Sequence, residues 1–195
     1  MPFRLKILLL AYLVFYPITS FADDVMDSIN LAIADYKAGN NSKAIENLDY
    51  AAQILRQKKG EGVSAVLPEA LDGWTAREAN STAIGGGMFG GVNASREYSK
   101  AESNVTITIM SDSPMIQSMS MIFSNPAMFG ARGQKILRIA GYNSVSRYVA
   151  ENKEGDIQIL VENKYLVTVS GNGVALEDLQ KYAEAVNYKA LAGLK

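Results

Sequence analysis

The chain has 195 residues, of which 48% are apolar and 20% are charged, a composition typical of one globular domain with a small appendage. It contains no histidine and no cysteine, which excludes Ser-His-Asp triads, thiolate nucleophiles, disulfides and metal sites built on either residue. The formal net charge is −1, and the only local basic cluster is Arg56, Lys58 and Lys59. Nucleic-acid binding, which needs many clustered basic residues, is therefore not predicted.

The N-terminus predicts a secretory signal peptide over residues 1–22. A short basic region precedes the apolar run 7–15, and residues 20–22 have the small-x-small pattern of a cleavage site. The apolar run is shorter than the ~20 residues that span a membrane, and an uncleaved anchor is the alternative. Cleavage would remove two basic residues and no acidic one, so the net charge would become −3. We expect a periplasmic protein without a transmembrane span.

Residues 23–60 predict a helical hairpin, because apolar residues recur three and four apart on both sides of a turn at 39–41. The expected buried positions are Val25, Ile29, Ala32, Ile33 and Tyr36 in the first helix and Ala44, Ile45, Leu48, Ala51, Ala52 and Leu55 in the second. The pattern resembles one tetratricopeptide unit, and such units usually need at least ~3 copies to bury their faces. The hairpin would therefore dock on the following domain or on a second copy, either as a packing appendage or as a partner-binding helix pair.

Gly60-Glu61-Gly62 predicts a hinge, so residues 61–66 would link the hairpin to a second domain at 67–195. Alternation and turn residues predict strands at 75–78, 93–100, 105–110, 134–139, 144–151, 156–161 and 165–170, and helices at 115–123 and 176–191. Short polar turns between the last four strands favour an antiparallel meander. The predicted fold is α+β: a mainly antiparallel sheet with the C-terminal helix and a Met-rich helix on one face, preceded by the hairpin.

The most distinctive candidate for a site is the Gly/Met-rich stretch 84–129. Its candidate partner-binding residues are Met88, Phe89, Met115, Met119, Phe123, Met128 and Phe129. In one interpretation these side chains form an adaptable apolar surface for a protein or a lipid; in another, Met115, Met119 and Met121 bind Cu(I) through their thioethers. In a third, Met115, Met119 and Ile122 are core residues. Met119 and Met121 lie about 200° apart on a helix, which disfavours a shared metal.

Without His or Cys, the remaining catalytic options are carboxylate pairs, Ser with Lys, Tyr or a bound cofactor, and no spacing predicts a Ser-Lys dyad. The candidate carboxylates are Asp112, Glu151, Glu154 and Asp156, the last three in or beside a turn, where charges are normally solvated. We therefore predict a protein that is not an enzyme and needs no cofactor. The sequence favours an exported binding or assembly protein that contacts another cell-envelope protein through the Gly/Met-rich stretch, the hairpin or both. The hairpin could also join two copies. The alternative is a periplasmic carrier of a small apolar ligand or of Cu(I).

A series of short motifs spans residues 67–194. In order they are Leu67-Pro-x-x-Leu-x-Gly-Trp74, Gly-Gly-Gly-Met-Phe-Gly-Gly at 85–91, Ser-Asp-Ser-Pro-Met at 111–115 and Ser-Asn-Pro at 124–126, followed by the strand 165–171 and a closing amphipathic helix. This order resembles a group of exported bacterial proteins. More distantly, strands followed by a helix are similar in order to PsbP-like domains. That resemblance implies a non-catalytic binding or assembly role and carries no site residues.

Overall fold

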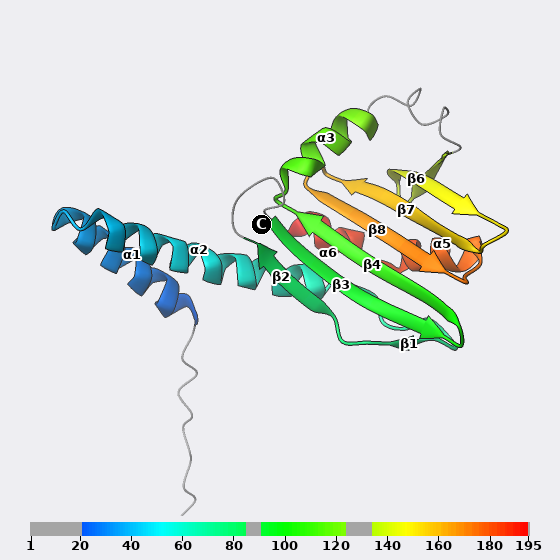
Figure 1. The fold of residues 1–195 in the computed structure, drawn as a ribbon, viewed down its shortest axis with the longest axis horizontal. Coiled ribbons are helices and arrows are strands. Elements are labelled where there is room, and N and C mark those ends of the chain that lie inside the picture. The colour runs from blue at the N-terminus through cyan, green and yellow to red at the C-terminus, as the bar shows by residue number, and fades with distance from the viewer. Residues whose placement is uncertain (1–20, 85–90, 124–133, 195) are drawn as a thin grey trace, which may run out of the picture.

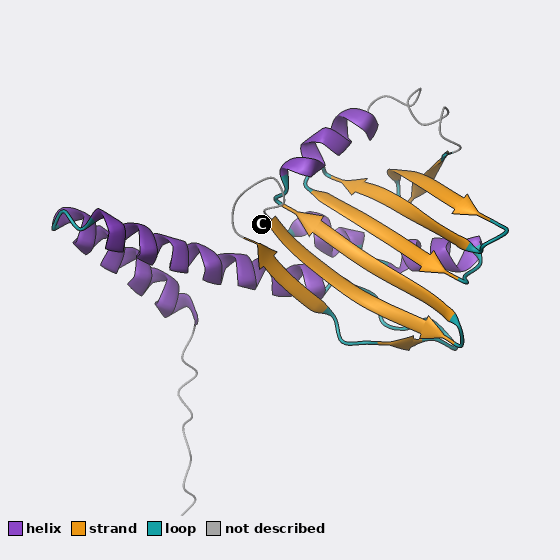
Figure 2. Cartoon of the chain, viewed as in Figure 1, coloured by secondary structure: helices purple, strands orange, loops and turns teal. Residues whose placement is uncertain are grey.

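The computed structural model describes residues 21–84, 91–123 and 134–194. A helical hairpin projects from an eight-stranded antiparallel sheet, and the C-terminal helices lie behind that sheet (Figures 1 and 2). The α+β class predicted from the sequence is confirmed. Residues 1–20 of the expected signal peptide lie outside the described residues.

The hairpin consists of α1 (Phe21–Lys37) and α2 (Asn41–Ser64), which turn at Gly39 with a φ of 78°. The predicted hinge at 60–62 is wrong, because α2 continues through it. A Cβ on Gly60 would lie 3.0 Å from Oγ of Ser81, and Val63 is fully buried. Glycine at position 60 therefore allows α2 to pack closely on the sheet.

The sheet is formed by two groups of strands that meet in its middle. They are β1 (Thr75–Ala76), β2 (Asn80–Ile84), β3 (Gly91–Lys100), β4 (Ser103–Ser111), β5 (Lys135–Ile139), β6 (Tyr142–Val149), β7 (Glu154–Val161) and β8 (Tyr165–Asn172). Their order is β1-β3-β4-β8-β7-β6-β5, and β2 also pairs with β3. The predicted meander is confirmed for β5 to β8. The pairing of β4 with β8, which places Ile107 opposite Val169, joins the two groups.

Two C-terminal helices, α5 (Leu176–Ala185) and α6 (Tyr188–Gly193), cover the apolar face of the sheet. The single helix predicted at 176–191 is wrong, because the chain leaves the helical conformation at Val186. Asn187 then starts α6 by accepting a hydrogen bond from the backbone N–H of Ala190 at 3.0 Å. The break turns Leu191, like Leu179 before it, fully into the core.

The Met-rich helix α3 (Pro114–Phe123) packs on the other face of the sheet. Phe123 and Met119 contact Val145 and Leu160, whereas Ile159, the residue before Leu160, faces the main core. Successive strand residues point to opposite faces. The expectation that α3 shares a face with the C-terminal helix is therefore wrong.

A charged clamp fixes the loop before β1 to β3. The guanidinium of Arg96 donates two hydrogen bonds of 2.9 Å to the carboxylate of Glu69 and one of 3.0 Å to the carbonyl of Pro68. The same contact lowers the pKa of Glu69 below its usual value. This arrangement holds the loop against the face of the sheet that carries the main core.

Buried tyrosine hydroxyls provide a pH-dependent test of the core. Tyr98 donates to the carbonyl of Pro68 at 2.7 Å and Tyr188 to that of Ala183 at 2.6 Å, and burial raises the pKa of both phenols. The stability that they contribute is complete below pH ~10, the usual tyrosine pKa, and is lost as the pH rises further. In a 295 nm titration of the native protein we expect both to ionise later than exposed tyrosines. Tyr188→Phe should shrink that late fraction, whereas a single transition near pH ~10 would contradict the burial.

Candidate docking surface on the helical hairpin

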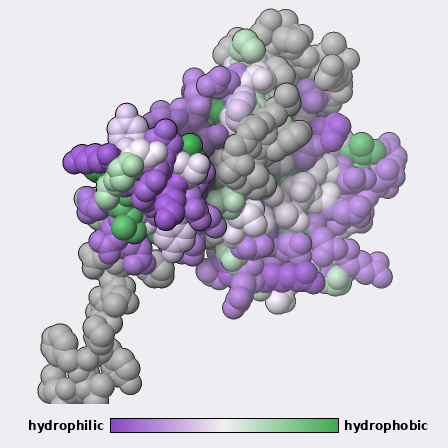
Figure 3. All heavy atoms as spheres, turned by 60° about the vertical axis from the view of Figure 1, so that its left-hand side comes forward, coloured by the Kyte–Doolittle hydropathy of each residue, from purple (hydrophilic) through white to green (hydrophobic). Residues whose placement is uncertain are grey.

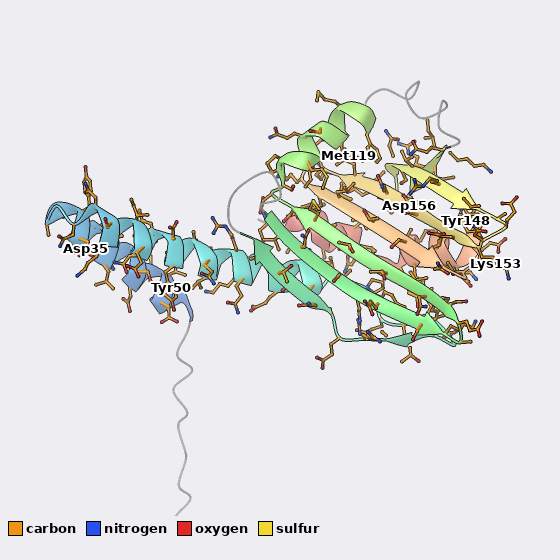
Figure 4. All side chains as sticks on the ribbon, viewed as in Figure 1. Asp35, Tyr50, Met119, Tyr148, Lys153 and Asp156 are labelled. Carbon is orange, nitrogen blue, oxygen red and sulfur yellow. The ribbon has the colours of Figure 1, made fainter. Side chains whose placement is uncertain are left out.

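The two hairpin helices are joined by a narrow seam of mainly small residues. The buried apolar positions are Val25, Ala32, Ala44, Ala51 and Ile54. One polar contact crosses between the helices, where the amide of Asn47 donates to the carboxylate of Asp35 at 3.0 Å, and Asp35 is labelled in Figure 4. Small seam residues let the helices approach closely, so the larger apolar side chains remain outside the seam.

Those larger side chains form a stripe on each helix, which together we call the hairpin face. Its members are Met26, Ile29, Ile33 and Tyr36 on α1 and Ile45, Leu48, Ala52 and Leu55 on α2. Apart from the half-buried Ile29 and Ala52, each is between 47% and 71% exposed. In each helix the stripe residues follow the seam residues by about one position, which corresponds to ~100° of rotation around the helix axis. Because the helices are antiparallel, this rotation brings both stripes to the same side of the hairpin.

A groove of about 610 Å³ runs along the hairpin face near its tip. It is lined by Ala32, Ile33, Tyr36, Asn41, Ala44, Ile45 and Leu48. Green, hydrophobic surface is correspondingly visible on the hairpin in Figure 3. With Asn41 as its only amide side chain, the groove offers little to orient a polar ligand. It instead suits the apolar side chains of another helix.

The opposite side of the hairpin differs in kind. Leu31 and Tyr50 are 56% and 55% exposed there, but the small groove around Tyr50 also contains Asp24, Gln53 and Gln57. Single exposed apolar residues among polar ones are ordinary on protein surfaces. Leu31 and Tyr50 therefore serve as matched controls for the hairpin face, and Tyr50 is labelled in Figure 4.

The predicted site in the Gly/Met-rich stretch is only partly described. Met88, Phe89, Met128 and Phe129 lie outside the described residues, as does the side chain of Ile122. Phe123 is wrong as a partner contact, because it is buried against Val145 and Leu160.

The described methionines of α3 face in different directions. Met119, labelled in Figure 4, is partly buried in the Phe123 cluster, whereas Met121 is 71% exposed and Met115 is 37% exposed. The buried positions of α3 include Ile116 rather than Met115. This divergence gives no support to a Cu(I) site shared by Met115, Met119 and Met121.

The candidate carboxylates are spread over separate surfaces. Nζ of Lys59 lies 2.7 Å from Asp112, and Nη2 of Arg147 lies 3.0 Å from Asp156. Asp156, labelled in Figure 4, lines a polar groove of about 590 Å³ on the sheet face not covered by α5 and α6. A polar outer face is normal for an antiparallel sheet whose other face holds the core. This groove is therefore a weaker candidate site than the apolar hairpin face.

Neither a metal site in the described residues nor a similarity to a known protein indicates a role for this chain. Within residues 21–84, 91–123 and 134–194, no three His, Cys, Asp or Glu side chains are grouped so that they could hold a metal ion. No helix in the same ranges combines the length and apolarity needed to cross a membrane. Comparison with protein-family models, curated proteins and solved structures gave no match. Function must therefore be inferred from the hairpin face itself.

Proposed function

We propose that the protein is an exported, non-enzymatic binding or assembly protein of the cell envelope, and that the hairpin face contacts an α-helical protein partner. The observation that carries this proposal is the exposure of six large apolar side chains on one side of two adjacent helices. Together with the half-buried Ile29 and Ala52, they are spaced three and four residues apart, which matches the spacing of anchor residues on an amphipathic helix. A partner helix could therefore place its own apolar stripe along the groove.

A protein partner fits this surface better than a lipid membrane. Helices that lie on membranes usually carry many Lys and Arg residues on their polar side. The polar residues of the hairpin are instead of mixed sign, with seven acidic and five basic side chains over residues 21–64. A carrier for a small apolar ligand is also less well supported, because carriers enclose most of the ligand surface, whereas this groove lies between only two helices.

A binding role also agrees with the chemistry of the side chains. The whole chain lacks histidine and cysteine. Among the candidate carboxylates, Asp112 and Asp156 are each engaged by a basic side chain. These pairings support structural tasks for both carboxylates, since each joins two segments of the fold.

Site-specific photo-cross-linking in intact cells tests the contact surface. A photoreactive phenylalanine derivative at Leu48 should give protein adducts at least ~10-fold more abundant than the same group at the equally exposed Tyr50. Adding Ile33→Asp to the Leu48-labelled chain should abolish them, because the partner would have to desolvate a carboxylate. Equal labelling from Leu48 and Tyr50 would show that the hairpin face is not the contact surface. Adducts with lipid alone would overturn the protein partner.

A further inference from the structure

We infer that the hairpin face pairs with the same face of a second copy, so that two hairpins form an antiparallel four-helix bundle with a sheet domain at each end. The inference rests on the proposed function, because it names the helical partner that this surface binds. Four features of the hairpin support it: the continuity of the α2 stripe, the direction in which it points, the area of the hairpin face and the spacing of its residues.

The stripe on α2 continues, toward the C-terminal end of the helix, into the surface of α2 that packs on the sheet domain. Val63 lies about five turns of ~3.6 residues after Ile45, so the two side chains project in the same direction. Val63 is fully buried against the sheet domain, whereas Ile45 is 59% exposed. The sheet domain thus covers the C-terminal part of the stripe, and no described residue covers the part before it.

This shared direction determines how a second hairpin can lie. From Lys59 onwards the sheet domain occupies the side of α2 toward which the hairpin face points, as the contacts of Lys59 with Asp112 and of Gly60 with Ser81 show. A second hairpin in parallel orientation would bring its own sheet domain into the same space. In antiparallel orientation its domain lies beyond the tip of the first hairpin, which projects clear of the sheet in Figure 1.

The area of the hairpin face is sufficient for a stable dimer. Six side chains of ~200 Å² each, about half exposed, present on the order of 600 Å² per copy. Two such faces would bury roughly 1,200 Å² from these side chains alone, which is the lower end of specific interfaces. A single partner helix would fill the groove but leave part of one stripe uncovered. A second hairpin covers both stripes at once.

The spacing of the stripes favours self-pairing. Both stripes repeat in steps of three, four and three residues, the spacing that interlocks in left-handed four-helix bundles.

Sedimentation equilibrium of the exported protein tests the dimer. We expect twice the chain mass for the parent and for Tyr50→Asp, the matched control on the opposite side. Leu48→Asp should weaken association at least ~100-fold, because the symmetric interface would contain the buried carboxylate twice. Trp74 is partly buried against the core, with its ring centroid 5.3 Å from that of Tyr182, so its fluorescence reports whether each variant remains folded. A monomer at every concentration, or a dimer unaffected by Leu48→Asp, overturns the inference.

Single cysteines test the antiparallel orientation, since the chain has none of its own. The two-fold axis should cross α2 near the middle of its uncovered part, close to Leu48. Oxidised Leu48→Cys should therefore form a disulfide-linked dimer, and Tyr50→Cys should not. A dimer without the Leu48→Cys link overturns the antiparallel arrangement. If the protein is a monomer but still forms Leu48-dependent adducts with another protein, the partner is not a second copy. The proposed function is then unaffected.

Discussion

Substituting valine for Gly171 is expected to prevent native folding or to lower the free energy of unfolding by at least ~3 kcal/mol. A Cβ at this position would overlap Cγ1 of Val174 and lie 2.7 Å from Cδ2 of Leu179. Both neighbours are buried, so neither side chain can move aside without opening the core. The same Cβ would lie 3.1 Å from the carbonyl oxygen of Asn104 on β4, which prevents β8 from shifting in that direction.

The matched control for this substitution is Gly193→Ala. A Cβ on Gly193 meets nothing within 4 Å in α6, so its effect should remain within ~0.5 kcal/mol. Urea unfolding followed by the fluorescence of Trp74 compares the two variants with the parent. An unchanged midpoint for Gly171→Val would contradict the close packing of α5 on β8.

Local sequence patterns predicted every strand except β2 but gave no information about distant strand partners. Alternation at 105–110 marks β4, and the short turn at 101–104 joins it to β3, so this pairing follows from neighbouring residues. The other partner of β4 is β8, which lies far along the chain. No alternation pattern specifies that choice. Burial of Ile107 and Val169 in one core stabilises it instead.

The two wrong helix boundaries err in opposite directions but share one cause. Gly60 and Gly62 each disfavour a helix by ~1 kcal/mol relative to alanine, but burial of Val63 and close contact at Gly60 outweigh that preference. At Val186 the sequence has neither Gly nor Pro, yet the helix ends so that α6 can turn Leu191 into the core. In both places tertiary packing overrides local propensity.

The hairpin was predictable from its apolar periodicity, but the hairpin face was not. Seam and face residues occupy adjacent positions in each helix, as in Ala32 beside Ile33 and Ala44 beside Ile45. The sequence pattern assigned them all to one buried stripe. In the structure the seam consists mainly of small residues, which allow the closest approach of α1 and α2, together with Val25 and Ile54, whereas most of the other large residues remain exposed. Residue size within the stripe was the available signal.

A chain that begins at Gln57 should retain a folded sheet domain, whereas a chain that begins at Val66 should lose at least ~3 kcal/mol of stability or fail to fold. Only the longer chain keeps Val63, which is fully buried in the main core, and Gly60, which packs on Ser81. Urea unfolding followed by Trp74 fluorescence compares the two chains, which differ only by residues 57–65. Equal stability of the two chains would show that residues 57–65 are not fixed to the sheet, as the predicted hinge at 60–62 requires. The antiparallel pairing of two copies would then lose its geometric basis, because that basis requires α2 to be fixed to the sheet.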